Sequence, residues 1–198
     1  MMNARLSALL IVLAVACLTG CSSVTKIEGE QTLQGRLTVR VNAAWNKLLP
    51  AGQEQPYEVW TQEGVGLDHL RLWAGTRSGD PLVVTAPAAA GQKPARVPVF
   101  RAEMAPDQLA SLFEALYALD GSQVQITRLE PAAFAGQSGL RFELAVVRQR
   151  DDVHLSVAGW LAVRQDELFA VTYAAPRLGF FRRGLPGVEA VVASARLR

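Results

Sequence analysis

The stretch "LRFELAVVRQRDDVHLSVAGWLAVRQDELFAVTYA", residues 140–174, decides the fold. Apolar and polar side chains alternate along most of it, which is the period-2 signature of half-buried strands. Two short polar segments interrupt the alternation, one around Asp151-Asp152 and one over 165–167. Tight polar turns between alternating strands are typical of an antiparallel meander. The stretch therefore predicts three consecutive antiparallel strands.

The same alternation outside this stretch predicts four more strands. They cover residues 35–41, 57–61, 69–74 and 123–129. Between the last two of these strands, residues 75–98 are rich in Pro, Ala and Gly, and this composition indicates a long loop. The segment 130–139 is turn-rich and is expected to join two strands.

Two segments carry the spacing of amphipathic helices. In 106–119, apolar side chains recur at i, i+3, i+4 and i+7, and Pro106 suits a first helical position. After Pro176, a second helix is expected with Pro186 near its start. Its apolar stripe consists of Leu185, Val188, Val191 and Val192.

Apolar side chains also occupy the second faces of the predicted strands. They are Trp60, Ala145, Val147, Ala158, Trp160 and Ala162. A sheet that is apolar on both faces needs cover on both sides. We therefore predict an α+β fold in which helices flank an antiparallel sheet, that is, an α/β/α sandwich.

The N-terminus reads as an export signal. Met1–Arg5 carries one positive charge, and 6–20 is an uncharged, mainly apolar run that is too short to span a bilayer. The run ends in Leu18-Thr19-Gly20-Cys21, which resembles the lipobox of bacterial lipoproteins. This resemblance implies cleavage between Gly20 and Cys21 and a diacylglycerol on the Cys21 sulfur.

Other interpretations of Cys17 and Cys21 are weaker. A redox pair usually has two residues between its cysteines, whereas three stand here within an apolar run. A metal site needs further Cys or His ligands, and the chain offers only His69 and His154. A plain signal peptide with an incidental Cys21 stays open as an alternative. The expected organisation is a signal peptide over 1–20, a polar tether over 21–34 and a single domain over 35–198.

The predicted order of elements has a counterpart among known folds. Helix, strand, "LEPAAFAGQSGLRFEL" (129–144), meander, "LFAVTYAAP" (168–176) and "GVEAVVASARL" (187–197) resemble small bacterial lipoproteins of the Mog1/PsbP-like fold class. Members of that class are known mainly as accessory or binding proteins without shared active-site chemistry. The resemblance therefore implies no set of catalytic residues.

The search for catalytic or metal-binding chemistry yields little. Gly136-Gln137-Ser138-Gly139 lacks the spacing of a nucleophile elbow and is explained by a tight loop. Asp151, Asp152 and His154 fit a polar hairpin turn better than a metal site. No nucleotide-binding glycine pattern occurs, and the net charge of +2 comes with scattered arginines. We expect no catalytic site, metal, cofactor or nucleic-acid partner.

Tryptophans are the remaining candidates for a binding site. Trp45, Trp60 and Trp73 lie in or beside predicted strands, and Trp45 and Trp73 stand close to loops. Aromatic side chains on strands most often pack in the core. The alternative is that these three rings line a groove for an apolar ligand or a partner peptide.

These features lead to two functional hypotheses. The first is a non-enzymatic lipoprotein that binds an envelope protein. The second is a carrier or sensor of a hydrophobic small molecule, held in a groove between helix and sheet. Ser22 after the lipidated cysteine predicts the outer membrane of a Gram-negative bacterium, with the domain facing the periplasm.

Overall fold

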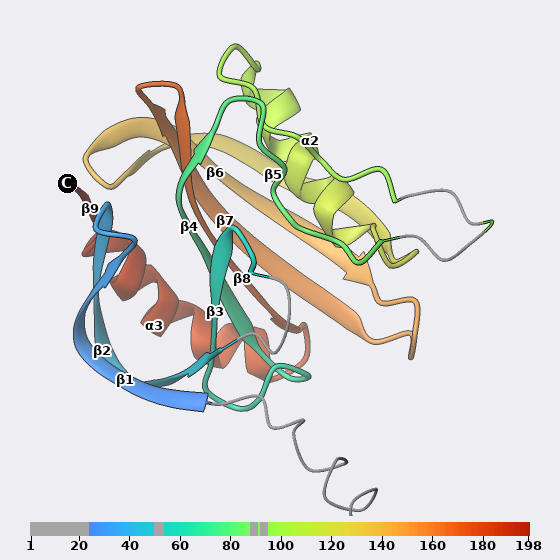
Figure 1. The fold of residues 1–198 in the computed structure, drawn as a ribbon. Coiled ribbons are helices and arrows are strands. Elements are labelled where there is room, and N and C mark those ends of the chain that lie inside the picture. The colour runs from blue at the N-terminus through green and yellow to red at the C-terminus, as the bar shows by residue number, and fades with distance from the viewer. Residues whose placement is uncertain (1–23, 50–53, 88–90, 92–94) are drawn as a thin grey trace, which may run out of the picture.

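The computed structural model describes residues 24–49, 54–87, 91 and 95–198. These residues form nine strands in one antiparallel sheet and two helices (Figure 1). The strands follow the order β1-β2-β3-β4-β8-β7-β6-β5, and β9 pairs with β2. The elements are β1 (Val24–Leu33), β2 (Leu37–Leu48), β3 (Tyr57–Thr61), β4 (His69–Arg77), α2 (Pro106–Tyr117), β5 (Gln123–Phe134), β6 (Gln137–Val147), β7 (His154–Arg164), β8 (Glu167–Pro176), α3 (Phe180–Ala193) and β9 (Arg196–Leu197).

The predicted meander is confirmed as β6, β7 and β8, which pair in sequence order. The turn between β7 and β8 consists of Gln165 and Asp166, both with positive φ (52° and 60°). Two positive φ values in a two-residue loop match the right-handed twist of a hairpin. The polar residues at 165–166 therefore set the register in which Arg164 lies opposite Glu167.

The two helices cover opposite faces of the sheet, as Figure 1 shows. One core lies between the sheet and α3 and contains Leu70, Leu72 and Val188. The other lies between the sheet and α2 and contains Trp73 and Phe113. Because successive residues of β4 enter different cores, the sheet is apolar on both faces. The predicted α/β/α sandwich is confirmed.

The α2 side of the sheet depends on one glycine. Phe142 on β6 lies opposite Gly159 on β7, and a Cβ at position 159 would stand 2.1 Å from the Phe142 ring. The same ring packs against Phe113 of α2, with ring centroids 5.0 Å apart. Gly159 therefore lets an aromatic side chain lie flat on the sheet beneath the helix.

The prediction of a polar tether over 21–34 is wrong for residues 24–33, which form strand β1. Only Ile27 and Leu33 of this strand are buried. A register shift between Ile27 and Gly29, where Gly29 has φ 70°, breaks the period-2 alternation. The alternation in this segment is therefore irregular, and the sheet includes Val24–Leu33, which precede residue 35.

Two further boundaries differ from the prediction. The segment 130–139 is mostly strand, because β5 and β6 meet in a two-residue turn of Ala135 and Gly136. Proline is tolerated at position 131 because β5 is the edge of the sheet. Helix α3 begins at Phe180, so Pro186 lies inside the helix and not near its start.

A candidate binding pocket beside helix α2

The three tryptophans proposed as groove residues lie in the cores. Trp45 and Trp60 are 3% and 1% exposed and pack between the sheet and α3, whereas Trp73 is fully buried on the α2 side. The Trp73 indole N–H donates to the Leu82 carbonyl over 3.0 Å. The sheet separates Trp73 from the other two rings, so the structure places them in the core and not around a common groove.

A pocket of about 440 Å³ lies elsewhere, between the C-terminal end of α2, the start of β4 and the β6–β7 connection. We call it the α2 pocket. Its walls combine apolar side chains with three arginines and one histidine. The lining residues are Tyr57, Val65, His69, Arg71, Val83, Thr85, Leu116, Tyr117, Leu119, Asp120, Ser122, Val146, Arg148, Arg150 and Leu155.

Arg71 is held in the wall of this pocket by two aromatic rings. Strand alternation puts His69, Arg71 and Trp73 of β4 on the face that α2 covers. The guanidinium carbon of Arg71 lies 5.4 Å from the Tyr57 ring centroid and 5.2 Å from that of Tyr117. Aromatic faces attract the planar guanidinium, so the two rings fix its orientation.

The Arg71 guanidinium has no anionic partner within the described part of the chain. Its Nε atom is buried, and the Nε–H donates a hydrogen bond to no described acceptor. Twelve ion pairs join described residues, and none includes Arg71. A half-buried charge without a hydrogen-bonded counter-charge is costly, and buried charges are usually paired. Arg71 is therefore a cation that the described residues leave available.

His69 lies beside Arg71 and carries a second unpartnered nitrogen. Its ring stacks on Tyr117 with centroids 6.2 Å apart, and Nε2 is buried without a described hydrogen-bond partner. Burial, followed by the charges of Arg71 and Arg148, holds the pKa of His69 well below 6.5, while a backbone hydrogen bond at Val65 opposes the shift. The imidazole is therefore neutral at neutral pH.

Tyr117 is fixed from below by strand β8. Its hydroxyl and that of Thr172 lie 3.0 Å apart in a buried hydrogen bond. Burial raises the pKa of Tyr117 above 10.0, so the phenol stays protonated. Because Tyr117 is the last residue of α2, this bond ties the helix end to the sheet at the point where the ring contacts Arg71.

The other two arginines of the pocket are already paired. Arg148 donates to both carboxylate oxygens of Asp151 over 2.7 Å and to the Gly66 carbonyl over 3.2 Å. Arg150 lies 3.4 Å from the same carboxylate. Asp120 lies in the wall and Asp151 beside it, so three guanidinium groups stand near two carboxylates, which leaves an excess of one positive charge.

The β3–β4 turn, which supplies one wall, is held by a buried carboxylate. Asp68 is 2% exposed and accepts hydrogen bonds from the Thr61 hydroxyl (2.6 Å) and from the backbone N–H groups of Gln62 and Glu63. These bonds satisfy the first backbone donors of the turn. Asp68 thereby fixes the backbone that carries Val65 to the pocket.

The acidic and histidine candidates of the sequence are not brought together for chemistry. The Asp151 carboxylate accepts a hydrogen bond from Arg148, and His154 is exposed at the start of β7. Within the described residues, no group of three or more His, Cys, Asp or Glu side chains is placed to hold a metal ion. Gly136 lies in the β5–β6 hairpin turn.

The lipidation and cleavage candidates Cys21 and Gly20 lie outside the described residues. Among the helices that the structure describes, none is both long and apolar enough to cross a bilayer.

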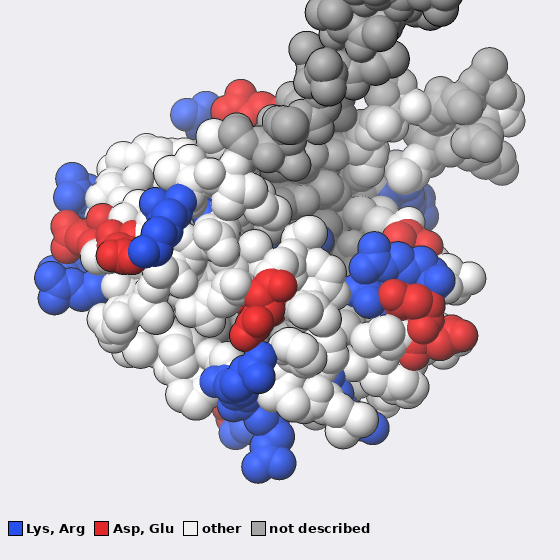
Figure 2. All heavy atoms as spheres, turned by 90° about the horizontal axis from the view of Figure 1, so that it is seen from below, with Lys and Arg blue, Asp and Glu red and all other residues white. Residues whose placement is uncertain are grey.

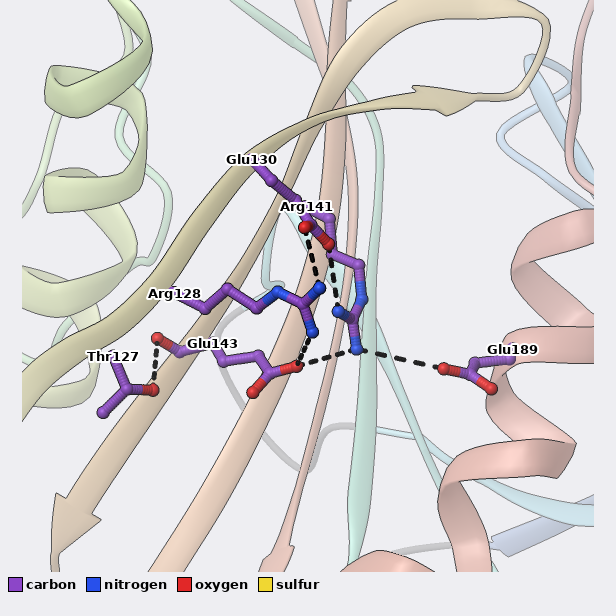
Figure 3. A network of polar contacts seen from close by, with 6 residues as sticks. All are labelled: Thr127, Arg128, Glu130, Arg141, Glu143 and Glu189. Carbon is purple, nitrogen blue, oxygen red and sulfur yellow. Dashed lines mark hydrogen bonds and ion pairs between the residues drawn. The ribbon is translucent and has the colours of Figure 1, made fainter.

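A second cluster of charges, shown in Figure 3, differs from Arg71 because its members pair with one another. Arg141 on β6 contacts Glu130 (3.1 Å), Glu143 (2.8 Å) and, across to α3, Glu189 (3.9 Å). Arg128 joins the same glutamates of β5 and β6. Hydrogen bonding to Arg141, above all, lowers the pKa of Glu130. Every charge here has a partner, so this network connects β5, β6 and α3 and offers no free group.

The charge on one face of the molecule is mixed in sign. On the face shown in Figure 2, lysine and arginine side chains stand beside aspartate and glutamate, and uncharged surface separates these mixed clusters. A phosphate backbone is normally followed by a continuous basic stripe. This face offers no such stripe among the described residues.

Sequence reasoning allowed for a groove between helix and sheet but named none of the residues that line the α2 pocket, although one signal for them existed. In "HLRLWA" (69–74), His69 and Arg71 share a face with Trp73. Since that face had to be covered by a helix, two polar side chains on it needed partners. The identity of the covering residues, Tyr117 above all, depends on the tertiary structure.

Comparison with known proteins supports the fold. The architecture is that of the Mog1/PsbP-like class. The solution structure of cyanobacterial PsbP (CyanoP) from Synechocystis is similar with a TM-score of 0.57 and 10% identity, over 91% of this chain and 96% of that one.

Two weaker structural similarities were also found. The Ran-binding protein Mog1p of Saccharomyces cerevisiae gives a TM-score of 0.45 at 9% identity, over 89% of this chain and 96% of Mog1p. LpqN of Mycobacterium tuberculosis, involved in cell envelope biogenesis, gives a TM-score of 0.31 at 10% identity. This match covers 91% of this chain and 87% of LpqN. No protein-family model and no curated protein matches the chain.

Proposed function

We propose that this protein is a lipid-anchored envelope protein without catalytic activity, which carries or senses a small molecule in the α2 pocket. Cys21 would hold it at the outer membrane, facing the periplasm. The observation that carries the binding proposal is Arg71, a guanidinium clamped between two tyrosine rings in the wall of a pocket and left without a described counter-charge. An oriented but unpaired polar group of this kind is typical of a ligand site.

The polar groups of the pocket support binding more than catalysis. Nucleophilic catalysis needs a nucleophile within hydrogen-bond reach of a base. Ser122 accepts a hydrogen bond from the Gln149 N–H (3.1 Å), and the Tyr117 hydroxyl is bonded to Thr172. In the part of the chain that the structure describes, neither hydroxyl is hydrogen-bonded to His69, whose Nε2 has no partner.

A protein partner is the second candidate function. Val65 and Leu67, in the turn that forms one wall of the pocket, are 54% and 41% exposed. Exposed apolar side chains next to a pocket favour contact with another protein. A partner could therefore insert a side chain into the α2 pocket while covering this turn.

A photo-crosslinking amino acid at Leu119, in the pocket lining, tests both candidates in intact cells. The matched control carries it at Gln137, in the β5–β6 hairpin. We expect an adduct from position 119 only, and its loss when Arg71→Gln is added. A small mass increase would indicate a carried molecule, and a large shift on a gel a protein partner. Identical adducts from both positions would contradict binding at the pocket.

A further inference from the structure

We infer that the α2 pocket binds an amphiphile with an anionic head, a carboxylate or a phosphate, and an alkyl chain. The head would lie against the Arg71 guanidinium and the chain along the apolar wall. This inference rests on the proposed carrier function and adds the chemical class of the ligand.

The head group follows from how the arginines are partnered. Arg148 and Arg141 each contact carboxylates within the domain, and Arg36 forms a fork-to-fork pair with Glu167. Arg71 alone among these four lacks such a partner in the described residues, yet it is the one whose orientation is fixed by two rings. A planar guanidinium recognises planar or tetrahedral oxyanions through paired N–H donors. An anion from outside the chain would complete the pairing.

The alkyl chain follows from the rest of the wall. Leu116 of α2, Val146 of β6 and Leu155 of β7 belong to both the pocket lining and the core beneath α2. An inorganic anion would gain nothing from these side chains, whereas an alkyl chain would bury CH₂ groups against them, which is favourable. The volume of about 440 Å³ lies within the usual range of small-molecule sites.

The source of the ligand follows from the strand register. Val24 pairs with Leu48, Leu48 with Val59, and Val59 with Arg71, so these residues form one row across four strands. Three interstrand steps of about 4.8 Å put Arg71 about 14 Å from Val24. Cys21 precedes Val24 by three residues, a reach of at most about 10 Å. A lipid anchor at Cys21 would therefore keep the pocket close to a membrane that supplies anionic amphiphiles.

Four photoactivatable probes test the inference on the full lipidated chain in nanodiscs of zwitterionic lipid. They share one diazirine-bearing decyl chain and end in a carboxylate, a phosphate, an alcohol or a trimethylammonium group. We expect the carboxylate or the phosphate probe to label the peptides that contain Leu116 and Leu155. The alcohol and ammonium probes should label them about tenfold less. The stronger of the two anionic probes identifies a fatty acid or a phospholipid as the source.

Variants connect the labelling to the guanidinium. Arg71→Gln should reduce anionic labelling to the level of the alcohol probe, and Arg71→Lys should keep a preference for anions because it keeps the charge. Arg40→Gln, at an exposed position on β2, should label like the wild type. Equal labelling by anionic and neutral probes, or a preference of Arg71→Lys for the alcohol, would overturn the anionic head and leave the carrier function in place. Labelling of the pocket peptides by none of the probes would overturn both.

Discussion

At the scale of single residues, the arginines of this protein have two kinds of surroundings. Arg36, Arg141 and Arg148 form paired contacts that hold elements together. Arg71 has its charge faced only by aromatic rings, and its neighbour His69 stays neutral beside it. Paired charges serve the architecture, and residues that break the pairing rule concentrate at functional sites. Of these four arginines, only Arg71, in the wall of the α2 pocket, lacks an ionic partner among the described residues.

The first prediction concerns Asp68, the buried carboxylate of the β3–β4 turn. Asp68→Asn would replace one acceptor oxygen by an NH₂ group that faces N–H donors, so buried donors would lose their partner. We expect a loss of about 2–3 kcal/mol in the free energy of unfolding, measured by urea denaturation. Asp152→Asn is the matched control, because Asp152 is exposed and asparagine tolerates its positive φ of 55°. Equal midpoints for the two variants would show that the turn does not depend on this carboxylate.

The second prediction concerns pH and His69. Burial lowers the pKa of His69 in the folded state, so below about pH 6.5 the unfolded chain takes up a proton that the folded protein refuses. This group therefore lowers stability as pH falls through the unfolded value and further toward the folded value. Between about pH 8 and pH 5, His69→Gln should lose less stability than the wild type. Urea midpoints at both pH values measure this, with the exposed His154→Gln as control. If His69→Gln lost as much stability between about pH 8 and pH 5 as the wild type, His69 would not be the buried neutral group that we infer.

At the scale of elements, the sheet and α2 pack through large aromatic side chains, which fit only where a neighbouring residue is small. Phe113 lies edge-on to Trp73 and tilted on Phe142, so three rings from one helix and two strands share the layer beneath α2. Gly159 makes that layer possible, because Phe142 occupies the place of its missing side chain. Interiors are packed closely enough that one added methyl group is felt.

The third prediction uses two glycines that should respond in opposite ways. Gly159→Ala puts a methyl group 2.1 Å from the Phe142 ring and should destabilise the domain by about 1–3 kcal/mol or more. Gly187→Ala lies inside α3 with nothing within 4 Å of the new Cβ, and it should stabilise by about 0.5–1 kcal/mol. Thermal unfolding of both variants measures the difference. A change of the same sign in the two proteins would contradict this view of the α2 layer.

The elements that could be predicted are those whose apolar period is regular. Strands β6, β7 and β8 and helix α2 repeat their apolar positions without interruption, and the sequence locates them to within a few residues. Strand β1 escaped prediction because the bulge at Gly29 shifts its alternation and only two of its side chains are buried. The residues that line the pocket could not be predicted, because its central contact joins Tyr57, Arg71 and Tyr117. No local pattern records a contact between three separate elements.

At the scale of the whole molecule, the correction at β1 changes how the domain would sit at a membrane. A tether ending at residue 34 would let the sandwich move freely away from the lipid. With β1 beginning at Val24, only Ser22 and Ser23 separate a lipidated Cys21 from the sheet. The first strand would thus hold the domain close to the bilayer surface. Arg71 would lie at the same end of the sheet, because it shares a row of paired residues with Val24.

The last prediction tests the anchor itself. Cys21→Ser removes the acceptor of the diacylglycerol, so the variant should lose labelling by a fatty-acid probe and run as an unprocessed or differently cleaved form. The wild type should take up the label and, because Ser22 follows the cysteine, fractionate with the outer membrane. Cys17→Ser is the matched control and should change neither property, since Cys17 would leave with the signal peptide.

The folded domain should not respond to the loss of the anchor, because neither cysteine lies among the described residues that form its cores. A chain without residues 1–21 should therefore keep the unfolding midpoint of the detergent-solubilised wild type. A chain without residues 1–34 should be clearly less stable, because it also loses β1 with the buried Ile27 and Leu33. Absence of lipid label on the wild type would refute the anchor. Equal stability of the two truncated chains would refute the place of β1 in the fold, and the two results are independent of each other.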